Sequence, residues 1–390
     1  MEGFVFPNEE HVTWSVMIVL YPYITGLVAG AFIVSSLYHV FGLKQLKPIA
    51  RFSLVSAFAF LLFATMPLLI HLGRPERALN IMITPHFTSA MSGFGYVYAT
   101  YTTLVMLEIW FEYRGDIVDR YHAASGIPRA ICKLLLLGAT TRNADTDRID
   151  HKIVRGLAGL GIPIACILHG YVGFLFGSLK ANPWWSTPLM FIIFLFSAIV
   201  SGVSVLVFLY MFVHAIQRKR MDQSVVNTLA RFLWGFMIIA VALELMDVLS
   251  IAYEQTEEWG LLKELITGRL LYSYVFAQLL LCSLGPFVLL SITVLGRLRP
   301  PWSNALIFSS AVLLLSQVLL MRWNVVIGGQ LVSKSFRGFT TYLPGLFDRE
   351  GLMMAVVILI IPFVLLRFFD RLFPFFPAAP TTSDLQGAKP

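Results

Sequence analysis

The sequence predicts an all-α protein, a polytopic transmembrane helix bundle with about nine spans, and eight to ten spans are compatible with its hydropathy. Two observations lead to this fold class. Hydrophobic residues make up 57% of the 390 residues and charged residues only 13%, about half the charged fraction of a typical soluble domain. Nine stretches are also long and apolar enough to cross a hydrocarbon core about 30 Å thick. We therefore expect one transmembrane domain over residues 1–376 and a small, polar, disordered tail at 377–390.

The expected spans follow the apolar segments in chain order. The first covers 14–41, and the residues before it carry Glu2, Glu9 and Glu10 but no Lys or Arg. A cleavable signal peptide begins with positive charge, so we expect this span to be retained. The other spans are expected at 52–72, 91–111, 156–179, 188–215, 232–253, 270–295, 305–323 and 352–369. The loop between spans three and four contains a short apolar run, 130–138, which we expect to form a helix on the membrane surface.

The distribution of basic residues predicts the orientation. Of the 29 Lys and Arg residues, 19 lie after spans one, three, five and seven or in the tail, and nine lie on the other side. The remaining one, Arg231, lies at the mouth of span six on the first side. Cytoplasmic loops carry an excess of Lys and Arg, so the N-terminus should face outward and the C-terminus the cytoplasm.

Two further features of the composition exclude classes of function. The net charge of +7 comes from short loops between apolar spans, so it does not indicate nucleic-acid binding. The three cysteines, Cys132, Cys166 and Cys282, are far apart and form no CxxC pair. They offer no disulfide framework and no zinc or iron–sulfur site, so we expect no metal site of the chain's own.

Polar residues of the predicted spans gather at one depth, in the outer half of the membrane. They are Tyr21, His71, Arg74, His169, Glu244, Asp247 and Gln278, joined at the outer end of span eight by Arg322, Asn324 and Gln330. Unpaired polar groups are costly in hydrocarbon, so a layer of them suggests a functional site.

Glu244 and Asp247 are the most informative members of this layer. They are three residues apart and therefore share one helix face. Two carboxylates one turn apart in hydrocarbon require cations, shared protons or water, so we expect them to transfer protons, with at least one neutral at pH 7.

Several of these residues also have a purely structural interpretation. Tyr21 can belong to an interfacial aromatic belt, Arg74 can anchor the helix end, and His169 can hydrogen-bond a neighbouring helix. Glu108, His39 and His214 lie near the inner ends of their spans, and for these we favour side chains that extend to the membrane surface.

The chemistry of the layer suits a quinone. A quinone needs a hydrogen-bond donor at each carbonyl, an apolar slot open to lipid, and groups that exchange two protons. Histidine, tyrosine and carboxylates supply these parts, although they suit proton-coupled transport equally well.

Several ordered strings resemble the NrfD/polysulfide reductase membrane-subunit family over nearly the whole chain. They are Trp14 with Tyr21 and Gly26–Gly30, His71–Arg77 (HLGRPER), Ser89–Gly93 (SAMSG), His169–Gly173 (HGYVG), Asn182–Trp185 (NPWW), Arg322–Asn324 (RWN) and Gly328–Gln330 (GGQ). The length and the last two strings look most like the larger members, which include the membrane subunits associated with dissimilatory sulfite reduction and with the Hmc and hydrogenase-2 complexes.

The resemblance implies a membrane quinone/quinol subunit of a respiratory complex in the prokaryotic cytoplasmic membrane. It would bind menaquinone or ubiquinone near the outer face, through Tyr21, His71 and His169 or Tyr171, with Arg74 adding positive charge. It would have no haem or iron–sulfur cluster of its own. The implied partners are an iron–sulfur ferredoxin-like subunit at the outer face, a multihaem cytochrome c and further redox subunits, with sulfur metabolism suggested by the larger relatives.

Two alternatives remain open on the sequence. In a dihaem cytochrome b, His71 and His169 would pair in the outer half and His39 and His214 near the inner ends, although no histidines lie 13 or 14 residues apart within one span. A proton-coupled transporter would show broken helices and inverted halves, and the sequence has no convincing internal repeat.

Overall fold

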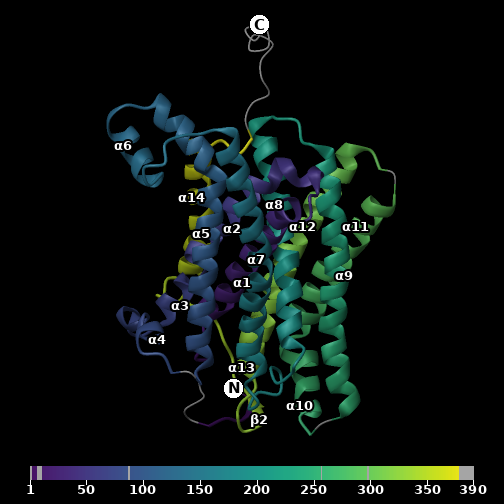
Figure 1. The fold of residues 1–390 in the computed structure, drawn as a ribbon. Coiled ribbons are helices and arrows are strands. Elements are labelled where there is room, and N and C mark those ends of the chain that lie inside the picture. Colours follow the sequence, from purple (N-terminus) through teal and green to yellow (C-terminus); the bar gives the residue numbers. More distant parts are fainter. Residues whose placement is uncertain (1, 7–10, 87, 256, 297, 377–390) are drawn as a thin grey trace.

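The computed structural model describes residues 2–6, 11–86, 88–255, 257–296 and 298–376, so the predicted tail at 377–390 lies outside the described residues. The described chain is a bundle of long helices, which confirms the all-α, polytopic prediction (Figure 1). Below, the end of the bundle at which α1 begins is called the lower end and the end at which α1 finishes is called the upper end, as drawn in Figure 1.

Eight helices of the described chain are long and apolar enough to cross a membrane. They are α1 (Val16–His39), α2 with α3 (Lys47–Ala64, Met66–His71), α7 (Ala144–Gly177), α8 (Met190–Gln217), α9 (Gln223–Glu254), η5 with α11 (Leu271–Leu284, Gly285–Leu295), α12 through η6 to α13 (Pro300–Trp323, Asn324–Gly328, Gly329–Leu331) and α14 (Leu352–Leu372).

The remaining predicted span, 91–111, corresponds to α5 (Ala90–Ala123). This helix is less apolar than the other eight, but Figure 1 shows it running the height of the bundle. Because α3 ends at the lower end and α7 begins at the upper end, α5 is the segment that returns the chain between them. The described chain therefore runs between the two ends of the bundle nine times when α5 is included, and eight of these passages are apolar enough to cross a membrane.

Short elements cover the two ends of the bundle. At the lower end β1 (Glu2–Phe4) pairs antiparallel with β2 (Arg337–Phe339), with Gly3 opposite Gly338. Also short are η2 (Lys44–Leu46), η3 (Pro75–Arg77), α4 (Asn80–Ile83), α10 (Trp259–Glu264) and η4 (Leu265–Arg269). The predicted surface helix is α6 (Gly126–Leu135), which begins four residues earlier than the apolar run and lies beside the upper end, with Ile127, Ile131 and Leu134 exposed (Figure 1).

The centre of the bundle is α1, which is buried along almost its whole length. It is apolar all round, and such a helix is stable only when other helices or lipid cover every face. In this fold α2, α7, α8 and α12 cover it. The site residues on α1 are therefore held on several sides at once.

Glycines allow α1 and α8 to approach closely. A Cβ at Gly30 would lie 2.6 Å from Gly202 Cα and 2.7 Å from the Ile199 carbonyl oxygen, and both of these are backbone atoms of α8. The absence of a side chain at Gly30 therefore permits this close approach. At Gly156 and Gly159 of α7, in contrast, an added Cβ would meet open space within this chain.

Gly30→Ala should lower the stability of the protein because the added methyl group must push two helix backbones apart. Such overpacking costs about 1–3 kcal/mol. Gly156→Ala is the matched control, since the same methyl group meets nothing there. Thermal unfolding in detergent should show a clear drop in Tm for Gly30→Ala alone, and equal shifts in the two variants would contradict the close contact.

Candidate functional site

A histidine–carboxylate pair lies at the lower rim of the bundle. His71 is the last residue of α3, and its Nδ1 lies 2.7 Å from Glu350 Oε2. The same carboxylate oxygen accepts a hydrogen bond from Ser15, the residue that caps α1. The side chains of His71 and Glu350 are 24% and 31% exposed, so a ligand can reach them. The pair joins α1, α3 and the loop before α14.

The environment keeps Glu350 ionised. Partial burial alone would raise the pKa of this carboxyl, but the hydrogen bonds from Ser15 and His71, with the charge of Arg349, lower it below its ordinary value. An ionised carboxylate favours the N–H of His71 on Nδ1. Nε2 makes no hydrogen bond to the described residues, so it can accept a proton from a ligand or, once protonated, donate one.

Tyr21 lies deeper in the same part of the bundle. It is 2% exposed, and its hydroxyl has no hydrogen-bond partner among the described residues. Its ring packs edge-on against Phe94 of α5, with centroids 5.4 Å apart. A buried hydroxyl is normally paired, so this orphaned donor is the kind of group that a ligand or a water satisfies.

His169 lies at a similar depth and joins α7 to α1. Its Nδ1 is 2.7 Å from the carbonyl oxygen of Ala165, and its Nε2 contacts the carbonyl oxygen of Thr25. Thr25 is one turn beyond Tyr21 and donates to the Tyr21 carbonyl at 2.7 Å. Both ring nitrogens of His169 therefore face backbone carbonyls, and neither is free for a ligand or for a haem iron.

The structure separates the other two predicted ligands from this group. Tyr171 is two residues from His169, about 200° around α7, and its hydroxyl lies against Gly93 of α5. Arg74 is exposed in the loop beyond α3, three residues after His71. The described residues thus bring together Tyr21 and His169, with His71 nearer the rim.

A buried arginine stands between the two halves of the site. Arg322 of α12 is 1% exposed, and its guanidinium carbon lies 3.7 Å from the centre of the Phe194 ring. It donates to Ser197 Oγ at 2.7 Å, while its Nε has no partner. None of the described carboxylates forms an ion pair with it, yet it interacts electrostatically with Tyr21 and Glu244.

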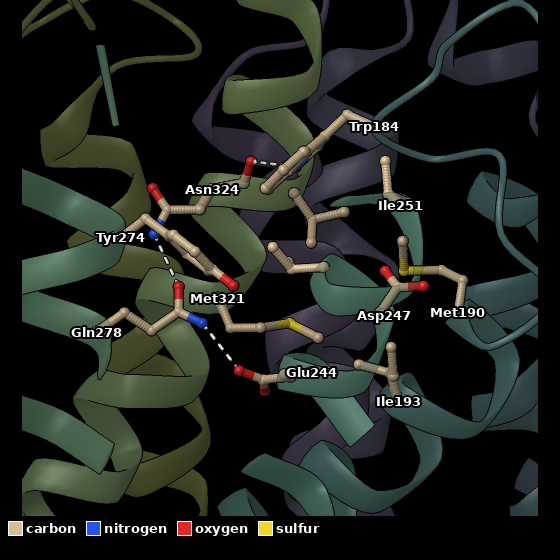
Figure 2. A pocket seen from close by; sticks show the side chains of 12 residues that line it. Trp184, Met190, Ile193, Glu244, Asp247, Ile251, Tyr274, Gln278, Met321 and Asn324 are labelled. Carbon is tan, nitrogen blue, oxygen red and sulfur yellow. Dashed lines mark hydrogen bonds between the residues drawn. The ribbon is translucent and has the colours of Figure 1, made fainter. Parts of the chain in front are cut away.

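Glu244 ends a directed chain of hydrogen bonds (Figure 2). Gln278 donates to Glu244 Oε2 at 2.9 Å and accepts from Asn324 at 2.7 Å, and Asn324 accepts from Ser273 at 2.7 Å. Gln317 adds a second amide donor at 3.2 Å from both carboxylate oxygens. Every donor in the chain points toward Glu244, so neutral amides surround a strongly accepting carboxylate.

Asp247 lines the same cavity as Glu244, as the shared helix face predicts (Figure 2). Its Oδ1 accepts from Thr187 Oγ1 at 2.6 Å. The cavity between them has a volume of about 40 Å³. That space holds a few water molecules but no quinone ring.

The motif strings at the lower end are joined to one another by hydrogen bonds. In the loop 182–185, Asn182 donates to the Gly329 carbonyl at 2.8 Å, and the indole groups of Trp184 and Trp185 donate to the carbonyls of Asn324 and Val325 at 3.0 and 2.6 Å. These acceptors lie in η6 and α13, where the wider π-helical turn disturbs the regular helix hydrogen bonds.

Gln330 links the start of α1 to the same segment through hydrogen bonds. Its Oε1 accepts from the Trp14 backbone amide at 2.9 Å, and its Nε2 donates to the Trp14 carbonyl at 3.1 Å. The Trp14 and Trp185 rings stack at 5.1 Å. The strings at 182–185 and 328–330 therefore hold the scaffold of the site, whereas its titratable groups come from other segments.

Sequence reasoning missed several partners. Glu350, Thr187, Gln317 and Tyr274 did not stand out because each meets the site from a distant part of the chain. Among the described residues, no group of three or more His, Cys, Asp or Glu side chains is arranged to hold a metal ion.

Comparison with known proteins agrees with this architecture. The family model for polysulphide reductase, NrfD matches residues 5–334. A selenate reductase subunit of Mesobacillus selenatarsenatis is 30% identical over 295 residues, which cover 74% of this chain and 69% of that protein. Protein NrfD of Escherichia coli is 26% identical, covering 50% of this chain and 59% of that protein. An Hdr-like menaquinol oxidoreductase integral membrane subunit of Archaeoglobus fulgidus is 23% identical, covering 59% and 50%.

Proposed function

This chain belongs to the polysulphide reductase NrfD family, and we propose that it is the quinone-reactive membrane subunit of a multi-subunit oxidoreductase complex. Its relatives bear the names of subunits of a selenate reductase and a menaquinol oxidoreductase, which supports a redox role and favours menaquinone as the substrate. An iron–sulfur partner at the lower end would exchange electrons with the bound quinone, and a multihaem cytochrome would complete the route. The basic loops of the upper end support placing the lower end on the outer face of a prokaryotic cytoplasmic membrane.

The His71–Glu350 pair carries this proposal. It places a titratable imidazole at the membrane rim, with one nitrogen fixed by a carboxylate and the other free. Tyr21 offers a second, deeper donor with no partner of its own among the described residues. A quinone head group has carbonyls about 5 Å apart, so with a hydrogen bond at each end it spans roughly 10–11 Å. Ser15, which bonds the same carboxylate oxygen as His71, lies about 9 Å along α1 from Tyr21. The levels of the two donors along the bundle therefore suit a quinone head group.

The chain's own groups would act as follows. His71 Nε2 takes a proton from a quinol hydroxyl, and Glu350 stabilises the imidazolium that forms. In the opposite direction the same nitrogen returns the proton. Tyr21 donates a hydrogen bond to the second oxygen, and Arg74 adds positive charge outside the rim. His169 has both nitrogens occupied, so it positions α1 against α7 and keeps Tyr21 at its depth.

His71→Asn and Glu350→Gln should each reduce quinol turnover by the intact complex at least tenfold, because a lost general base typically costs 10²–10⁴-fold. Tyr21→Phe should weaken the binding of a quinone analogue while leaving assembly intact. His86→Asn is the matched control, an exposed histidine in the loop before α5. Parent-like turnover and affinity in all three assembled variants would show that the quinone binds elsewhere.

We also propose that Glu244 and Asp247 belong to a proton route that leaves the quinone site at the lower end. The cavity that they share has room for water but not for a quinone ring, and amides and a hydroxyl, rather than cations, hydrogen-bond to them. Two such carboxylates, one turn apart, can pass a proton through water between them.

Glu244→Gln and Asp247→Asn should therefore slow proton-coupled turnover several-fold without loss of assembly. The isosteric changes keep the hydrogen-bonding shape but remove the titratable group. Glu254→Gln, at the end of the same helix and exposed, is the control. The proton stoichiometry of the assembled complex should fall in the two variants alone, and unchanged turnover and stoichiometry in both would refute the route.

A further inference from the structure

Buried polar atoms without a hydrogen-bond partner lie on α1 and on three other helices, most of them in the middle and upper part of the bundle. The described residues contain ten buried side-chain nitrogen or oxygen atoms with no hydrogen-bond partner, on Tyr21, Ser35, His39, Tyr101, Glu108, Ser204, Gln217 and Arg322. All of these residues lie on α1, α5, α8 and α12. Native proteins pair nearly all such atoms with protein groups or ordered water, so a cluster of orphans indicates internal water.

Glu108 is the carboxylate in this set, so its burial without hydrogen-bond partners is especially costly. It is 0% exposed, and neither of its carboxylate oxygens has a partner. The expectation that Glu108 extends to the membrane surface is wrong, because α5 continues to Ala123 and places Glu108 about 22 Å from the helix end. His39 is 5% exposed with both ring nitrogens unpaired, so it does not reach the surface either.

One face of α5 carries a stripe of titratable residues. Tyr98, Tyr101, Glu108 and Glu112 are spaced three, seven and four residues apart, which places them on one side of a helix over about 21 Å. This side faces α1, because the Tyr101 ring packs against Phe32 with centroids 5.4 Å apart. Glu112 lies one turn from Glu108, and Tyr101 interacts electrostatically with both Glu108 and Cys166 of α7.

The stripe opens at the upper end into a cavity of about 1010 Å³. Glu112, Arg51, His39 and His151 line it, and the His39 and His151 rings are 6.3 Å apart. Arg51 holds Glu112 at 2.7 Å. A space of this size, with charged side chains in its lining, has room for many water molecules, and such water would bring protons to Glu112 and His39 from the upper face.

The other end of the stripe meets the proposed quinone site. Tyr98 interacts electrostatically with Tyr21, and Tyr21 interacts with Arg322. Arg322 interacts in turn with Glu244. Titratable side chains therefore occur at intervals from the upper cavity to the lower half of the bundle.

We propose that this stripe is a proton path between the upper cavity and the Tyr21–Arg322 level, with Glu108 as the internal carrier. Glu108 accepts one proton from water on the cavity side and releases one, through internal water, toward the Tyr101 hydroxyl, which lies about 10 Å away along α5. That hydroxyl accepts the proton on oxygen while giving up its own, so each passage moves one proton and no electron. A metal cation is a poorer occupant, because it requires several oxygen ligands and the buried stretch offers one carboxylate.

The proton path depends on the proposed function in one respect, because quinol turnover is the reaction that would drive protons along it.

The experiment uses the intact complex in sealed vesicles, oriented with the upper face inward. A pH-sensitive dye is enclosed in the vesicles, and quinol turnover is measured in parallel. The parent should show a pH change inside that accompanies turnover. Glu108→Gln should reduce this signal per turnover at least tenfold, and Tyr101→Phe should reduce it several-fold. The control is Thr103→Val, on the exposed side of α5, which should behave as the parent.

Two results would overturn the path. One is a parent signal no larger than that of vesicles made leaky with a protonophore, and the other is a parent-like signal per turnover in both assembled variants. A purely structural role of Glu108 would change Tm without changing the proton signal, and this also counts against the path. Quinone-analogue binding on the same preparations tests the proposed function separately. Parent-like affinity in His71→Asn would count against the proposed quinone site and would leave the Glu108 result valid.

Discussion

A guanidinium without an ion pair, buried at the level of the site, is the constraint on which the lower half of this bundle depends. Arg322 cannot be left unsolvated in hydrocarbon, and the described structure surrounds it with the Phe194 ring, Ser197 and backbone oxygen rather than with a carboxylate. Its charge therefore acts on groups at longer range, Tyr21 on one side and Glu244 on the other. A positive charge shared in this way favours negative charge on either side, which suits a site that gains and loses protons.

Contacts around this charge bring together family strings that are far apart in the sequence. The loop 182–185 and the segment 324–330 are distant in sequence, yet the tryptophan indoles of one hydrogen-bond the carbonyls that the π-helical turn of the other leaves available. Gln330 then holds the beginning of α1, and Glu350 holds α1 to α3. These hydrogen bonds between distant segments are thus concentrated at the lower end, where the proposed quinone site needs precise geometry.

Much of the architecture could be predicted from the sequence, because span length, apolar periodicity and basic loops depend on local composition. The depth of Tyr21 and His169 and the shared face of Glu244 and Asp247 follow from helix geometry alone. The partners of these groups could not be predicted in the same way. Glu350 lies in a loop with no periodicity, 279 residues from His71. Glu108 was misjudged because the predicted span ended at 111, whereas the helix runs on to Ala123, which moves the carboxylate from the rim to the interior.

The most direct test of the proposed function is the structure of the intact complex with a tightly bound menaquinol analogue. The head group should lie within hydrogen-bond distance of His71 Nε2, with Tyr21 at its second oxygen and the His71–Glu350 contact preserved. A head group bound instead in the upper cavity beside His39 and His151, or in an enlarged space between Glu244 and Asp247, with His71 and Tyr21 free of contact, would contradict the account.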